Sequence, residues 1–203
     1  MKVGPRFKVG KRLGASVYEK CQTQKFALSE SKSGKQGKRR PGTRSEYGRQ
    51  FLEKQKVRVT YGVSEKQFKN YVKGAMSSTT SNPFDNLFKS LESRLDNAVY
   101  RMGLAKTRRG ARQMVSHGHI IVNGKKLTVP SYRVNSGDVL SIRPGSKVSP
   151  LFSDMTDKLK DRGSSAWTTF DPSTYSGKIG ALPKYERTEH AFDLTPVIEF
   201  YSR

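Results

Sequence analysis

Apolar residues between residues 46 and 116 recur at three- and four-residue spacing, the pattern of helices that bury one face. Ser45 can act as the N-cap of a first helix, which should run to about Val59. Ser64 and Gln67 have the spacing of a capping box, which indicates the start of a second helix. This part of the chain is therefore predicted to be helical.

The next helical segment has the longest apolar face in the sequence. Asn82 and Pro83 supply an N-cap and a proline in the first turn, and Gly103 marks the end. A further helix is predicted from Thr107, as its cap, through Ser116. The apolar face that follows Pro83 consists of Phe84, Leu87, Phe88, Leu91, Leu95, Val99 and Met102.

After Gly118 the hydrophobic period changes from helical to alternating. Ile120 to Val122, Asn123-Gly124 and Lys125 to Leu127 read as a strand, a type I′ turn and a return strand. A second strand pair is predicted around 132–134 and 139–143, whereas 144–180 show little pattern. Helices followed by antiparallel hairpins predict an α+β fold.

The first 43 residues lack a sustained apolar period and are rich in Gly, Ser and basic residues. We expect an extended basic arm without a core, which becomes ordered when it contacts phosphates. A merely solubilising tail is the alternative. Aromatic and apolar residues between the charges favour anchoring: Phe7, Leu13, Val17, Tyr18 and Phe26.

Charge identifies the kind of partner. The chain has 39 Lys and Arg against 17 Asp and Glu, a net charge of +22. Residues 1–60 hold 17 basic and 4 acidic side chains, and 91–146 hold 10 and 3, whereas 147–203 are balanced at 8 and 8. Such concentration predicts a polyanion that offers many phosphates. A membrane surface fits less well, because no run of 18 apolar residues occurs.

Cysteine use and the amino-terminal residues bear on the compartment. Cys21 is the single cysteine, which excludes an intrachain disulfide and a cysteine-cluster zinc site. The first residues contain no apolar stretch of the kind found in secretory signals. We expect a cytoplasmic protein without metal or cofactor; an organelle-encoded protein would look the same.

The middle segment carries the strongest candidate site. Arg108, Arg109 and Arg112 lie on the first turns of a predicted helix, where the helix dipole disfavours cations unless an anion is bound. Three guanidiniums at this spacing, beside the basic hairpin, predict a phosphate site suited to RNA backbone. An ordinary solvated helix face is the alternative, but no acidic residue lies between Asp96 and Asp138.

The segment ESRLDNAVYRMGLAKTRRGARQMVSHGHIIVNGKK, from Glu92 to Lys126, resembles the signature of the small-subunit ribosomal protein four family. The module also occurs in pseudouridine synthases, bacterial tyrosyl-tRNA synthetases and a heat-shock ribosome-binding protein. The opening GPRFKVGKRLG and the segments Ser45 to Val72 and Leu182 to Arg203 resemble the ribosomal family as well. Only Cys21 stands where many relatives have four zinc-binding cysteines, so this chain resembles the zinc-free type.

The resemblance implies three regions. These are a basic arm in 1–43, a helical domain in 44–90 completed by 181–203, and an RNA-binding module in 91–180 with a core motif in 92–146. It further implies a structural constituent of the small ribosomal subunit that binds ribosomal RNA at a multi-helix junction, nucleates assembly, influences accuracy and lines the region where messenger RNA enters. Small-subunit proteins five and three are the implied protein partners, with Glu189, Ile198 and Tyr201 at such an interface.

The predicted RNA contacts are the basic residues of the arm, the first helix and the module, with neutral donors of the hairpin. No phosphate loop, metal-spaced cluster or hydrolase motif supports an enzyme. A stand-alone RNA chaperone or ribosome-rescue factor remains the second alternative. The predicted contacts are Arg6, Lys8, Lys11, Arg12, Lys38, Arg39, Arg40, Arg44, Arg49, Lys54, Lys56, Arg58, Lys106, Arg108, Arg109, Arg112, His117, His119, Asn123, Lys125, Lys126 and Arg133.

Overall fold

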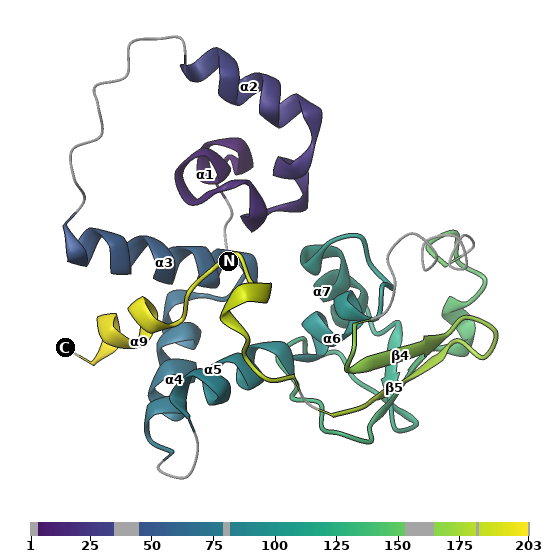
Figure 1. The fold of residues 1–203 in the computed structure, drawn as a ribbon. Helices are drawn as coiled ribbons and strands as arrows, with labels where there is room; N and C mark the ends of the chain where they lie inside the picture. Colours follow the sequence, from purple (N-terminus) through teal and green to yellow (C-terminus); the bar gives the residue numbers. More distant parts are fainter. Residues whose placement is uncertain (1–3, 35–44, 79–81, 153–164, 182, 203) are drawn as a thin grey trace. The chain divides into compact units, whose positions relative to one another are not determined.

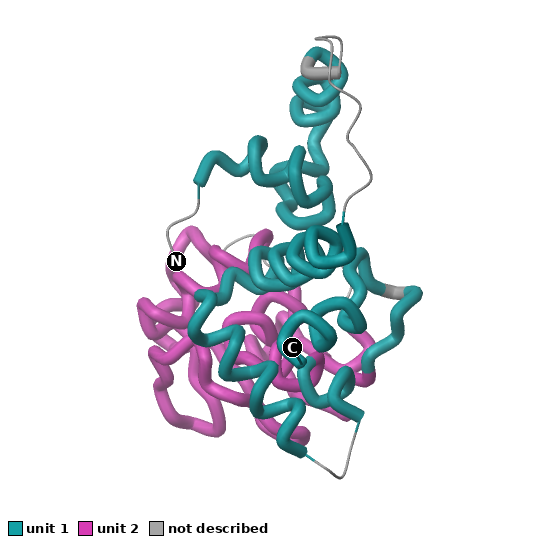
Figure 2. The backbone as a smooth tube through the Cα atoms, turned by 90° about the vertical axis from the view of Figure 1, so that its left-hand side faces the viewer, with its two compact units in different colours: residues 1–87, 185–203 teal, residues 88–184 magenta. Residues whose placement is uncertain are grey.

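The computed structural model describes all residues except 1–3, 35–44, 79–81, 153–164, 182 and 203 (Figure 1). The chain divides into two compact units (Figure 2). The first comprises residues 1–87 and 185–203, and the second comprises Phe88–Lys184. The first unit thus combines the two segments assigned to the helical domain with the amino-terminal segment.

Helices form the first unit, and two of them begin at the predicted caps. The Ser45 hydroxyl accepts a hydrogen bond from the Gly48 amide at 3.2 Å, and the Ser64 hydroxyl accepts one from the Gln67 amide at 3.3 Å. Helix α9 packs on α3, where Gln50 Nε2 donates to Glu199 Oε2 at 3.1 Å. The elements are α3 (Glu46–Thr60), α4 (Glu65–Met76), α5 (Pro83–Glu92), whose residues from Phe88 on belong to the second unit, the 3-10 turn η4 (Arg187–Glu189) and α9 (Thr195–Tyr201).

The amino-terminal segment differs from the expected arm. Among its described residues, Leu13 and Val17 form a small core with Val59 of α3, and Cys21 and Phe26 are buried. The prediction of an arm without a core is therefore wrong here, because Leu13 and Val17 pack against Val59 of α3 and the Phe26 ring packs edge to face on that of Phe7 within the segment. Its elements are α1 (Arg6–Leu13), the 3-10 turns η1 (Ala15–Val17) and η2 (Glu19–Gln22), and α2 (Gln24–Gly34).

The second unit packs helices on one face of a five-stranded antiparallel sheet of order β2-β1-β3-β5-β4. Val99, Ala111 and Val115 of the helices share one core with Ile120 and Leu140 of the sheet. Its elements are α6 (Leu95–Arg101), α7 (Arg108–Ser116), β1 (Ile120–Val122), β2 (Lys125–Lys126), β3 (Val139–Ile142), the 3-10 turn η3 (Pro144–Ser146), β4 (Thr168–Asp171) and β5 (Ser176–Ile179). The α+β fold class is confirmed.

The predicted hairpins have different outcomes. Asn123 and Gly124 have φ of 47° and 78°, as a type I′ turn requires, and Val122 pairs with Lys125. The second predicted pair is half wrong: 139–142 is a strand, but the described residues 132–134 contain only an isolated bridge between Arg133 and Arg94. Strand β3 pairs instead with β1 and β5.

Candidate RNA-binding surface

Helix α7 begins where the sequence indicated. Thr107 has an extended backbone, and its hydroxyl accepts a hydrogen bond from the Gly110 amide at 3.0 Å. Ala111, Met114 and Val115 turn inward to the core. The opposite side of the first turn therefore carries the three arginines, of which Arg109 is exposed.

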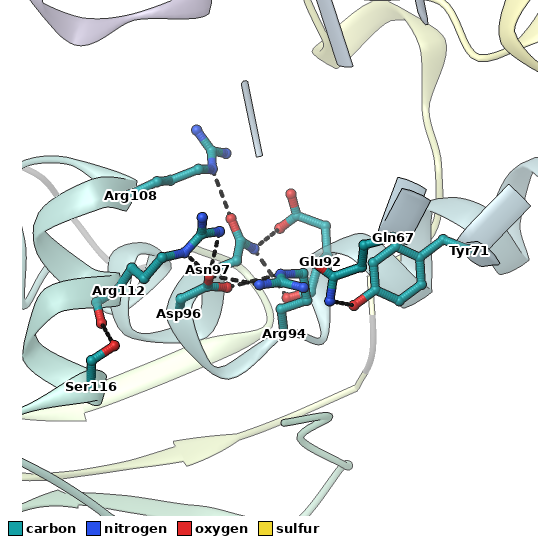
Figure 3. A network of polar contacts seen from close by, with 9 residues as sticks. All are labelled: Gln67, Tyr71, Glu92, Arg94, Asp96, Asn97, Arg108, Arg112 and Ser116. Carbon is teal, nitrogen blue, oxygen red and sulfur yellow. Dashed lines mark hydrogen bonds and ion pairs between the residues drawn. The ribbon is translucent and has the colours of Figure 1, made fainter. Parts of the chain in front are cut away.

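Arg112 is held by a carboxylate of the chain itself. Its Nε and Nη2 lie 2.8 Å and 2.7 Å from Asp96 Oδ2 (Figure 3). Arg94 contacts the same carboxylate, with Nε 3.0 Å from Oδ1 and Nη2 2.8 Å from Oδ2. The side chains of Arg94 and Asp96 are both 4% exposed, whereas that of Arg112 is 31% exposed. The anion that the helix start requires is thus partly supplied by Asp96.

A second carboxylate, Glu92, organises the neighbouring arginines. It is fully buried, and its two oxygens accept hydrogen bonds from Nε and Nη2 of Arg101, both at 2.8 Å. Asn97 donates from Nδ2 to Glu92 Oε2 at 2.9 Å and accepts from Arg108 Nε at 2.8 Å. The Arg108 guanidinium also lies 4.4 Å from the centroid of the Tyr100 ring.

We call this set the arginine cluster: Arg94, Arg101, Arg108 and Arg112 with Glu92, Asp96 and Asn97. It sets four guanidiniums against two carboxylates, which leaves a surplus of two positive charges. The spacing at the start of α7 predicted only two of these arginines, Arg108 and Arg112. Of the other five members, Arg101 lies at the end of α6. The other four lie in the segment ESRLDN, where polar residues interrupt an otherwise apolar helical pattern, and this interruption was the available signal.

The hairpin residues fall into two groups. Lys125, Lys126 and His117 are exposed, as are Lys106 and Arg133 elsewhere in the unit. Asn123 is also exposed, but its side chain holds the turn by accepting from the Val139 amide at 2.9 Å and donating to Asp138 Oδ1 at 2.8 Å. The cations therefore suit phosphate contact better than the asparagine does.

His119 is half-buried and has a protein partner. Its Nδ1 lies 2.9 Å from Ser146 Oγ, and its ring meets Phe152 edge to face at 6.0 Å. Burial, followed by the positive potential of His117 and Arg143, lowers the pKa of His119 below its ordinary value. The imidazole is thus neutral near pH 7, so it contributes no charge to a phosphate site.

Three of the four predicted cations of helix α3 have acidic partners and do not form a free basic face. The Lys54 side chain is 6% exposed, with Nζ 2.6 Å from Glu65 Oε1 and 4.6 Å from the Phe200 ring centroid. Lys56 pairs with Glu53 at 2.6 Å, and Arg58 lies 3.3 Å from Glu65 Oε2. A phosphate contact by Lys54 does not fit this burial, and Lys56 and Arg58 also have acidic partners.

The remaining predicted contacts of the first unit lie mostly at its surface. Lys8, Lys11, Arg12 and Arg49 are exposed, and Arg6 is half-buried. Lys11 Nζ donates to the Ser29 carbonyl at 2.7 Å. Four further predictions lie outside the described residues: Lys38, Arg39, Arg40 and Arg44.

The residues predicted to contact a protein partner are only partly exposed or already have partners within the chain. Ile198 is half-buried, and the Tyr201 hydroxyl donates to Glu65 Oε1 at 3.0 Å. Burial and this carboxylate raise the pKa of Tyr201 above its ordinary value. The side chain of Glu189 lies outside the described residues.

Comparison with known proteins places this geometry in a family. The model of the ribosomal protein S4/S9 N-terminal domain matches residues 2–92, and the S4 domain model matches residues 93–140. The chain is similar to small ribosomal subunit protein uS4 of Ligilactobacillus salivarius, with 41% identity over 98% of both chains. This chain belongs to the ribosomal protein uS4 family. It is also 40% identical to uS4 of Halothermothrix orenii over 98% of both chains, and 42% identical to uS4B of Clostridium acetobutylicum over 99% of this chain and 97% of that one.

Membership of the uS4 family confirms the resemblance seen in the sequence and identifies a structural ribosomal protein rather than an enzyme. The S4 domain match includes α6, α7 and the β1–β2 hairpin, and therefore the whole arginine cluster except Glu92. Among the described residues, no helix is long and apolar enough to cross a membrane. The same part of the chain contains no group of three or more His, Cys, Asp or Glu side chains that could hold a metal ion.

Proposed function

We propose that this chain is a structural constituent of the small ribosomal subunit and binds small-subunit ribosomal RNA through its S4 domain. The observation that carries the proposal is the arginine cluster, whose two surplus positive charges lie in the same unit as the exposed Arg109, Lys125 and Lys126. Guanidinium groups bind phosphate oxygens through paired N–H donors. The relatives are named as small ribosomal subunit proteins, which supports small-subunit ribosomal RNA as the binding partner.

The finer proposal is that the chain binds at a multi-helix junction and nucleates subunit assembly. Each unit has its own exposed cations, such as Lys8 and Arg12 in the first and Arg109 and Lys125 in the second. Two basic surfaces on one chain can contact more than one RNA segment, which a junction requires. Three further points are proposed from the family resemblance alone. The chain contacts small-subunit proteins five and three, contributes to the accuracy of translation, and contacts messenger RNA where it enters the subunit.

The first test is whether the tagged chain sediments with small subunits in a sucrose gradient after a high-salt wash. An integral ribosomal protein stays with the particle, because many phosphate contacts and buried surfaces hold it. Release to the top fractions would contradict the proposal and favour a transient RNA chaperone.

The second test measures binding of the purified chain to small-subunit ribosomal RNA as a function of salt. Arg109→Ala should lower the slope of log affinity against log salt by about 0.7–0.9, the value of one phosphate contact. Lys178→Ala is the matched control, since Lys178 is an exposed cation of the same unit that lies on β5 and is part of neither α7 nor the β1–β2 hairpin. Equal slopes for both variants and the unaltered chain would exclude Arg109 from the site.

A further inference from the structure

The arginine cluster reverses the usual exposure of an ion pair at a protein surface. Its carboxylates are inside: Glu92 is fully buried and Asp96 is 4% exposed. Two of its cations reach solvent, since the side chains of Arg101 and Arg112 are 28% and 31% exposed, whereas that of Arg94 is 4% exposed. The acidic groups therefore face the protein, and Arg101 and Arg112 face outward.

Stability alone does not explain this arrangement. Burying a carboxylate is unfavourable unless it is fully paired, and well-packed apolar residues often replace a buried ion pair without loss of stability. Glu92 and Asp96 avoid the penalty because Arg101 and Arg112 each donate to them from both Nε and Nη2, and because Asn97 and Arg94 add further hydrogen bonds. The gain from such pairing is a fixed orientation of each guanidinium plane.

We propose that Glu92 and Asp96 are positioning residues for RNA binding. Glu92 holds Arg101, Asp96 holds Arg112, and Asn97 holds Arg108, so that the solvent-facing parts of three guanidiniums meet RNA phosphates at set positions. This inference rests on the proposed function and adds Arg101 to the predicted RNA contacts. The buried Arg94 supports Asp96 from the inside.

Pre-organisation is the physical reason. A long basic side chain loses rotamer freedom when it binds a phosphate, and this loss weakens binding. Arg101 and Arg112 have already lost that freedom on folding, because their carboxylates hold them. An exposed lysine such as Lys125 loses it on binding. The held arginines should therefore bind phosphate more tightly than their charge alone predicts.

The proposal gives the opposite sign from simple electrostatics. Replacing Asp96 by asparagine raises the net charge by one, so a purely electrostatic account predicts tighter RNA binding. Positioning predicts weaker binding, because Arg112 loses its charged acceptor and its fixed orientation. We expect the affinity of Asp96→Asn for small-subunit ribosomal RNA to fall about tenfold, as for the loss of one charge-assisted hydrogen bond.

Glu30→Gln is the matched control. Glu30 is an exposed acid on α2, so its substitution adds the same unit of charge without touching the arginine cluster. Its affinity should equal or slightly exceed that of the unaltered chain. Affinities are compared per folded molecule, with folding measured by the fluorescence of Trp167, a core residue of the second unit. Folded Asp96→Asn that binds as tightly as Glu30→Gln would overturn the proposal.

Two further measurements separate positioning from a purely structural role. NMR relaxation of the arginine Nε–H groups should show faster motion of Arg112 in free, folded Asp96→Asn. If that variant does not fold, Asn97→Leu replaces it, since it keeps the net charge and removes the acceptor of Arg108. Unchanged affinity of Asn97→Leu would then overturn the proposal. Failure of the unaltered chain to bind ribosomal RNA better than another structured RNA would instead refute the proposed function.

Discussion

Replacing Arg94 by methionine should destabilise the second unit by about 3 kcal/mol. Arg94 and Asp96 form a buried pair, with both side chains 4% exposed and two hydrogen bonds of 2.8 Å and 3.0 Å. Removing one partner of a buried pair costs about 3–5 kcal/mol, because the other charge stays buried. The lower end applies here, since the half-exposed Arg112 still contacts Asp96.

Urea unfolding monitored by Trp167 fluorescence measures this loss of stability in the second unit, which contains Arg94. Trp167 is the only tryptophan of the chain, and it is buried in the core that contains α6, α7 and the sheet. For a unit of this size the urea dependence of the unfolding free energy is about 1.5 kcal/mol per molar. A loss of about 3 kcal/mol therefore lowers the unfolding midpoint by about 2 M.

Arg109→Met is the matched control, because it makes the same change at an exposed position of α7. It should alter the unfolding free energy by about 0.5 kcal/mol or less, as for other exposed substitutions. Equal midpoints for the two variants would refute the reasoning, because they would show that the buried pair adds no more than a surface arginine.

Two other predictions concern the first unit. Partial burial acts to raise the pKa of Glu65, but the hydrogen bonds from Lys54 and Tyr201 and the charges of Lys54 and Arg58 lower it below its ordinary value. The ionised Glu65 therefore stabilises the fold at pH values above its ordinary pKa, and this stability is lost as the pH falls through the lowered pKa. Urea unfolding midpoints measured at a series of pH values should consequently fall less steeply on the acid side for Glu65→Gln than for the unaltered chain. Gly10→Ala should cost about 1–3 kcal/mol by overpacking, since the added Cβ would lie 2.5 Å from Cys21 Sγ. If Gly10→Ala leaves the urea unfolding midpoint unchanged, as measured by circular dichroism, the predicted crowding is contradicted.

Local interactions explain what the sequence could predict. The caps at Ser45, Ser64 and Thr107 and the Asn123-Gly124 turn depend on hydrogen bonds or dihedral angles within a few residues. These features are visible in a short window of sequence, and the structure confirms them. Pairing partners are not visible in this way. The β4–β5 hairpin of residues 168–179 gives no signal in the sequence, because its strands contain Gly, Ser and Thr rather than a clear alternation of apolar and polar residues.

The amino-terminal segment shows the same limit. Its apolar residues are too sparse to suggest a core, and Leu13 and Val17 are buried in a cluster that includes Val59 of a later helix. A pattern search within the first 43 residues cannot find a partner that lies outside them. The same limit applies to the candidate site. No acidic residue lies between Asp96 and Asp138, which suggested unpaired arginines, but Asp96 itself contacts Arg112 from the preceding helix.

The relative exposure of the two side chains in each ion pair decides which cations can bind RNA. In the Lys54–Glu65 pair the lysine side chain is 6% exposed and the glutamate side chain 48% exposed, so the pair presents negative charge to an approaching phosphate. In the Arg112–Asp96 pair the exposures are 31% and 4%, so the pair presents positive charge. Both pairs are neutral in a count of charges, yet they act on RNA with opposite signs at close range. The net charge of +22 therefore identifies the class of partner, and the direction in which each pair faces identifies the surface that binds it.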